Sequence, residues 1–80
     1  MKKTIFNDNL WGLSSFNEIG YDKEHQLLTI YYYSGEVLEF QNVKEKDVFE
    51  LIISTDKEEL INQTFKTTFP YKIVDNLSIL

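Results

Sequence analysis

The chain of 80 residues has no cysteine, and it contains only one proline and three glycines. Without cysteine it forms no disulfide and offers no thiolate to a metal, so a secreted disulfide scaffold is not expected. No apolar run approaches the ~18 residues that a membrane span needs, and polar residues follow Met1-Lys2-Lys3 too soon for a signal-peptide core. We therefore expect a soluble, cytoplasmic protein that does not associate with membranes.

Arginine is also absent, and thirteen acidic residues stand against eight lysines, which gives a formal net charge of −5. Proteins that bind nucleic acids neutralise phosphates with clustered lysine and arginine, and arginine also stacks on bases and grips them with two hydrogen bonds. The lysines of this chain are mostly scattered. The composition therefore argues against nucleic-acid binding.

Hydrophobic residues make up 42% of the chain and aromatic residues 15%, enough for a packed core. At this length one core is close to the lower limit of self-sufficiency. The sequence shows no internal repeat and no linker, so we expect a single domain over residues 1–80. Its core should cover about residues 13–73. The apolar N-terminal segment and the C-terminal tail, which ends in NLSIL, should form extensions that pack on the core or, for the tail, on a partner.

Two alternating segments, Phe16 to Tyr21 and Leu27 to Tyr33, predict strands separated by a polar hairpin loop. The turn after Tyr33 has two candidate forms. A three-residue loop with Gly35 in the left-handed conformation pairs Ile30 with Leu38 and keeps the apolar residues on one face. A two-residue loop pairs Ile30 with an acid instead, so the pattern favours the longer loop.

After Val43 the apolar period changes from that of a strand to that of a helix. Apolar residues predict a helix from about Glu45 to Ser54 with a broad buried side: Val48, Phe49, Leu51, Ile52 and Ile53. Thr55 and Asp56 can cap a second helix, and Pro70 limits its end. Leu60, Ile61, Thr64 and Phe65 should share its buried face. The expected fold is α+β: a three-stranded antiparallel meander followed by two helices packed on one sheet face.

The order of these signals resembles the KTSC domain, a module named for the C-terminus of some lysyl-tRNA synthetases and also found as a free-standing small protein. The resemblance covers roughly Leu13 to Ile73 and rests on the residues Ser14-Ser15, Ile19 to Asp22, Gly35, Asn62, Phe65 and Phe69 to Tyr71. It implies the fold given above, and an RNA-binding role has been suggested for such domains from their synthetase context.

This chain departs from the family pattern at three places. Leu38-Glu39-Phe40 stands where the family has Tyr-x-Tyr, and Val43-Lys44 stands where it has Val-Pro. Ser54 to Glu58 replaces a small-x-Ser-x-Gly stretch between the helices. These departures remove several residues that an RNA-binding role would use.

The run Tyr31-Tyr32-Tyr33 is the most suggestive binding feature, since Tyr31 and Tyr33 should lean away from the core face. Such tyrosines can be covered by the chain's own extensions, anchor a protein interface or stack on bases. Base stacking would require a lysine patch beside them, made from Lys44, Lys46 or Lys72. Our candidate binding residues are therefore Tyr31, Tyr33, Lys44, Lys46 and Lys72.

Catalytic signals are weak. His25 is the single histidine and lies in a predicted exposed loop, and no nucleophile elbow, phosphate loop or metal-binding spacing is present. We expect no enzyme activity and no cofactor. The sequence favours a small non-catalytic interaction module that binds another protein. The alternatives are an RNA-binding module and an acidic inhibitor that imitates nucleic acid with Glu45, Asp47, Glu50, Asp56, Glu58 and Glu59.

Overall fold

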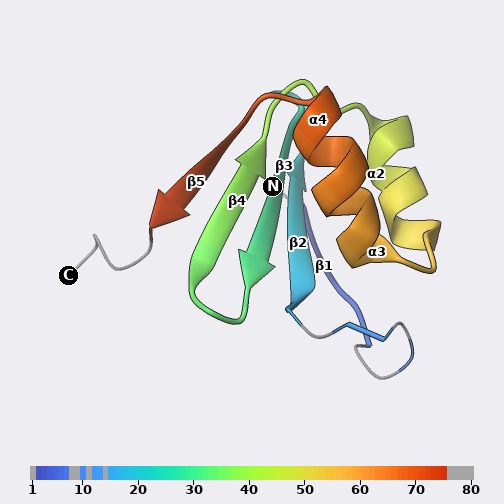
Figure 1. The fold of residues 1–80 in the computed structure, drawn as a ribbon. Helices are drawn as coiled ribbons and strands as arrows, with labels where there is room; N and C mark the ends of the chain where they lie inside the picture. The colour runs from blue at the N-terminus through green and yellow to red at the C-terminus, as the bar shows by residue number, and fades with distance from the viewer. Residues whose placement is uncertain (1, 8–9, 11, 14, 76–80) are drawn as a thin grey trace.

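The computed structural model describes residues 2–7, 10, 12–13 and 15–75. These residues form a five-stranded antiparallel sheet in the order β1-β2-β3-β4-β5, with helices over one of its faces (Figure 1). The strands are β1 (Lys2–Ile5), β2 (Phe16–Asp22), β3 (Leu27–Tyr32), β4 (Glu36–Phe40) and β5 (Tyr71–Asp75). The helical layer consists of α2 (Glu45–Ile53) and one continuous helix made of α3 (Lys57–Glu59), the π-helical segment η1 (Leu60–Phe65) and α4 (Lys66–Thr68).

The α+β class is confirmed, but the prediction of a three-stranded meander is wrong, because the sheet has five strands. Each terminal extension adds a strand to an edge of the meander: β1 pairs with β2, and β5 pairs with β4. A three-stranded sheet would leave two rows of unpaired backbone groups, and these extensions satisfy them. The apolar tail NLSIL lies outside the described residues.

The hairpin between β3 and β4 has the predicted register. Ile30 pairs with Leu38, Leu28 pairs with Phe40, and Gly35 has a positive φ of 95°. The amide of Gly35 donates to the carbonyl of Tyr32 over 3.1 Å, which closes the loop. The three-residue loop is therefore confirmed.

The core lies between the sheet and the helices. Its buried members come from every layer: Phe6, Phe16, Ile19, Leu28, Ile30, Leu38, Phe40, Val43, Val48, Leu51, Ile61 and Phe65. Ile52, which was expected on the buried side of its helix, is only partly buried against this cluster.

Both helices begin and end close to the predicted residues. The carboxylate of Asp56 accepts from the backbone N–H of Glu59 over 3.2 Å, as the capping pattern predicts. The helix ends before Phe69, which is extended because Pro70 follows it. Thr64 is exposed, contrary to its expected place on the buried face. The other residues predicted on this face do face the core: Ile61 and Phe65 are buried, and Leu60 is partly buried.

Candidate functional site

The five predicted binding residues do not form one patch, because the sheet separates them. Strand pairing places Tyr31 and Lys72 on the open face of the sheet, opposite the helices. Lys44 precedes α2 and Lys46 lies on it, so both belong to the helical layer and both are exposed. Tyr33 lies in the hairpin loop and is 53% exposed. Of the three lysines expected beside the tyrosines, Lys72 alone shares the open face with Tyr31, and it lies two strands away, on β5.

On the open face, Tyr31 has a lysine beside it that the sequence did not suggest. The ammonium of Lys3 lies 5.0 Å from the centroid of the Tyr31 ring. The same ammonium is 3.7 Å from a carboxylate oxygen of Glu18, and the ammonium of Lys72 is 3.6 Å from one of Glu39. Each lysine of this face therefore has an acidic neighbour that offsets its charge.

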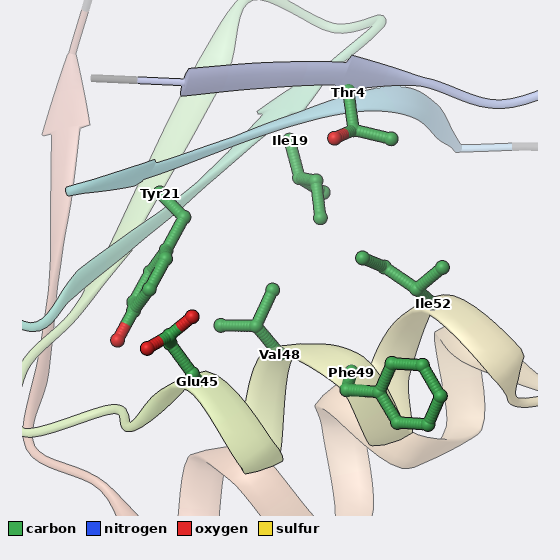
Figure 2. A pocket seen from close by; sticks show the side chains of 7 residues that line it. All are labelled: Thr4, Ile19, Tyr21, Glu45, Val48, Phe49 and Ile52. Carbon is green, nitrogen blue, oxygen red and sulfur yellow. The ribbon is translucent and has the colours of Figure 1, made fainter. Parts of the chain in front are cut away.

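A pocket opens on the other face of the sheet, at the margin where α2 crosses β1 and β2 (Figure 2). Its volume is about 260 Å³, and its lining is mainly apolar: Thr4, Ile19, Tyr21, Glu45, Val48, Phe49 and Ile52. In Figure 2, Ile19 and Tyr21 extend from β2 toward α2, where Val48 and Ile52 face them. The phenol of Tyr21 donates to the carbonyl of Val43 over 2.6 Å and fixes one end of the pocket.

The outer side of α2 contradicts the prediction of a broad buried face. Val48 and Leu51 are buried, but Phe49 is 61% exposed and Ile53 is 55% exposed. The two exposed residues are four positions apart and therefore lie on one side of the helix. The sequence did contain this signal, since a run of five apolar residues in six positions is more than one helix face can bury.

The joint between the helices is organised by a buried lysine. The ammonium of Lys57 donates to the backbone carbonyls of Leu51, Ile52 and Ser54, and it lies 4.8 Å from the ring centroid of Phe6. These carbonyls belong to the end of α2, where helical partners run out. Burial lowers the pKa of the Lys57 ammonium from its ordinary value of 10.5. The residue has a structural role that sequence reasoning missed.

Another joint residue, Glu58, accepts hydrogen bonds from the backbone N–H and the hydroxyl of Ser15, at 2.8 and 2.6 Å. This contact ties the start of β2 to α3, so Ser15 has a structural role. Ser14 lies outside the described residues.

His25 and Asp22 form a local pair in the loop between β2 and β3. Nδ1 of His25 lies 2.8 Å from a carboxylate oxygen of Asp22, and the other oxygen accepts from the backbone N–H of Glu24. The hydrogen bond from His25 lowers the pKa of the Asp22 carboxyl. Neither residue lines the pocket.

Metal-binding clusters and membrane-crossing helices are both absent among the residues that the structure places. No group of three histidine, aspartate or glutamate side chains there could hold a metal ion. None of the helices in this part of the chain has the length and apolar character required to cross a bilayer.

The fold and the site define a small α+β domain with a five-stranded antiparallel sheet, two helices on one face and an apolar pocket at one margin. Residues 14–69 match the KTSC domain family, and the chain belongs to this family. Its fold is similar to the crystal structure of a KTSC domain protein from Yersinia pestis, with a TM-score of 0.75 at 16% sequence identity. That alignment covers 91% of this chain and 96% of the other, so the likeness concerns the fold of the whole domain. No curated protein matches the chain.

Proposed function

We propose that this KTSC domain is a small non-catalytic interaction module that binds another protein. The observation that carries the proposal is the pocket at the α2 margin, with Phe49 exposed by 61% beside it. An exposed aromatic side chain next to an apolar concavity is typical of protein interfaces, where a few aromatic anchors supply most of the binding free energy.

The non-catalytic part of the proposal is supported by the surroundings of His25. A general base acts within hydrogen-bond reach of a bound substrate. The imidazole of His25 instead pairs with Asp22 in an exposed loop, and neither residue lines the apolar pocket. The pocket itself offers one carboxylate, that of Glu45, whose oxygen lies 3.0 Å from the ammonium of Lys23.

RNA binding is the second candidate, and the observation that favours it is the group of Tyr31, Lys3 and Lys72 on the open sheet face. The carboxylates of Glu18 and Glu39 and the net charge of −5 weigh against it. Fluorescence anisotropy with a labelled single-stranded RNA tests this. We expect no binding at physiological salt tighter than the ~10⁻⁴ to 10⁻⁶ M of non-specific binders. Submicromolar, salt-sensitive binding that Tyr31→Ala abolishes would return the function to the nucleic-acid class.

The acidic-inhibitor alternative is weakened by what the acids of the helical layer do. Asp47 accepts from the backbone N–H of Lys44, Asp56 accepts from that of Glu59, and Glu58 holds Ser15. Side chains that cap helices or tie elements together are held by those contacts. They are poorly placed to imitate the regular phosphates of a nucleic acid.

Affinity capture from cells that produce the protein tests the proposed function. The tagged chain is purified with and without nuclease treatment, and bound proteins and nucleic acids are both identified. We expect a protein partner that survives nuclease and does not bind a tag-only control. Recovery of nucleic acid alone, or loss of every protein partner on nuclease treatment, would contradict the proposal.

A further inference from the structure

Strand β1 has a strand on one side only in the part of the chain that the structure describes. The amide of Phe6 donates to the carbonyl of Asn17 over 2.7 Å, which sets the phase of the ladder between β1 and β2. In an antiparallel pair the residues alternate in the direction of their backbone groups. Those of Thr4 therefore point toward β2, and those of Lys3 and Ile5 point away from it. Lys3 and Ile5 thus offer two N–H donors and two carbonyl acceptors along the outer edge.

The pocket opens at this same edge. Thr4 belongs to β1 and lines the pocket together with Phe49 and Ile52 of α2, and Figure 2 shows Thr4 extending from β1 on the side of the helix. A strand added outside β1 would lie roughly 4.8 Å from it. The side chain of that strand opposite Thr4 would point to the same face, over Phe49 and Ile52. Among the residues that the structure describes, the outward backbone groups of β1 and the apolar side chains of Phe49 and Ile52 therefore meet at one margin of the sheet.

We propose that the β1 edge accepts an extended segment of a partner protein as a sixth, antiparallel strand, with one large apolar side chain of that segment in the pocket. This inference rests on the proposed function and names the site and the chemistry of the partner. The mode is β-strand addition, in which backbone hydrogen bonds give affinity and pockets for alternate side chains give specificity.

The size and charge of the pocket specify the segment. A volume of about 260 Å³ is below the roughly 300–1,000 Å³ of small-molecule sites and suits a single side chain. Glu45 supplies the charge in the lining. It lies at the end of the pocket near Tyr21, whose pairing partner on β1 is Lys2. Strand β1 runs away from that end, so an antiparallel segment runs toward it. The residue of the segment that reaches Glu45 therefore follows the apolar anchor in the partner's sequence. The Lys23 ammonium lies 3.0 Å from a carboxylate oxygen of Glu45, but both side chains are exposed, so a lysine or arginine of the segment can share this carboxylate with Lys23 or replace it.

A second copy of the chain fits this edge poorly. Two β1 strands joined antiparallel through Lys3 and Ile5 have three symmetric registers. One places Thr4 opposite Thr4 and leaves the pocket without an apolar anchor. Another places Lys3 opposite Lys3, with like charges directly across. The third requires Phe6 as the anchor, and Phe6 is 7% exposed in the core.

A displayed library of random decapeptides, selected on the wild-type domain, tests the proposal. We expect enriched peptides with a large apolar residue followed by a basic one on the same strand face. Phe49→Glu should weaken them by about tenfold or more, as loss of an anchor contact does. Ile73→Glu is the matched control, because Ile73 is 58% exposed on the opposite edge strand, and it should leave binding unchanged.

Nuclear magnetic resonance locates the bound peptide. Amides of Lys3 and Ile5 should shift and exchange more slowly with solvent, and N-methylation of the peptide at the paired positions should abolish binding. The proposal is overturned if no peptide is enriched, if Phe49→Glu binds equally well, or if the shifts centre on β5. Self-association in sedimentation equilibrium that Phe49→Glu removes would assign the edge to a second copy, which also overturns it.

The two proposals fail separately. If the protein captured from cells still binds the Phe49→Glu variant, the protein-binding function stands and the β1 edge is the wrong site. If capture yields nucleic acid alone, the proposed function itself fails.

Discussion

Two helices pack on the same face of the sheet, yet they close against it differently. In η1, Ile61 and Phe65 are 1% and 2% exposed, and the Phe65 ring lies 5.7 Å from that of Phe40 on β4. In α2, Leu51 is fully buried, but Phe49 is exposed by 61%. We call the contact of Ile61 and Phe65 with the sheet the closed side. We call the margin of α2 with β1 and β2, where the pocket lies, the open side; it is on the helical face of the sheet and is distinct from the open face.

The difference indicates which residues serve folding and which are available for binding. Burying a phenylalanine side chain contributes about 1.5–3 kcal/mol, and Phe49 leaves much of this unrealised in the isolated domain. Burial by a partner would recover it. Under the proposed function, the closed side accounts for stability, and the open side holds apolar surface for an interface. The predictions below test that division, from the largest expected effect to the smallest.

Ile30→Ala should destabilise the domain by about 2–5 kcal/mol, because it removes a buried side chain from the middle of β3 and leaves a cavity. Chemical denaturation measures the change in the free energy of unfolding. Ile73→Ala is the control, since Ile73 is exposed on β5. An unchanged unfolding midpoint for Ile30→Ala would contradict the strand register.

Lys57→Met should destabilise by about 1–3 kcal/mol, because it keeps the apolar stem but removes the ammonium that donates to the carbonyls of Leu51 and Ser54 at the end of α2. Lys66→Met, on the exposed surface of α4, is the control. A variant as stable as the wild type would show that these carbonyls find other partners.

The same pair of proteins gives a pH test. Burial lowers the pKa of Lys57, so the folded state releases this proton at a lower pH than the unfolded state does. Below 10.5 and above the folded pKa, the unfolded state binds more protons, and the wild type gains stability as pH rises. Lys57→Met lacks this gain. The stability difference between the two proteins should therefore widen as the pH approaches 10.5 from below.

Gly35→Val should destabilise by more than about 1 kcal/mol, since a β-branched side chain is disfavoured at the positive φ that the hairpin requires. No atom lies within 4 Å of the position of an added Cβ, so the effect is one of backbone conformation rather than of collision. Gly35→Asn, which tolerates this conformation better, should recover part of the loss. Equal stability of all three proteins in thermal unfolding would refute this account.

The parts of the fold that the sequence predicts are those fixed by local chemistry. The β3–β4 register follows from alternation and Gly35, and the start of the second helix follows from Asp56 as its cap. Strands β1 and β5 were missed because the short segments KKTI and YKIVD become strands through pairing with neighbours far along the chain. Such pairing has no local signal.

The candidate site was less predictable for the same reason. Alternation places Tyr31 and Lys72 on one face only once the pairing of β5 is known. Lys46, by contrast, falls in the predicted helix on the core face, so its separation from Tyr31 follows from the expected fold. The periodicity of α2 indicates a broad apolar side but not how far the sheet extends beneath it. The exposure of Phe49 is decided by that tertiary margin.

Phe49→Ser gives the smallest expected change in stability and the sharpest test of the division between the two sides. Substitutions at exposed positions usually change the free energy of unfolding by no more than about 0.5 kcal/mol, and Phe49 is 61% exposed. Phe65→Ser, on the closed side, should cost about 3–5 kcal/mol, because Phe65 is 2% exposed. Comparable losses for the two variants in denaturant unfolding would mean that Phe49 contributes to the core. The open side would then be part of the folding machinery rather than surface held for a partner.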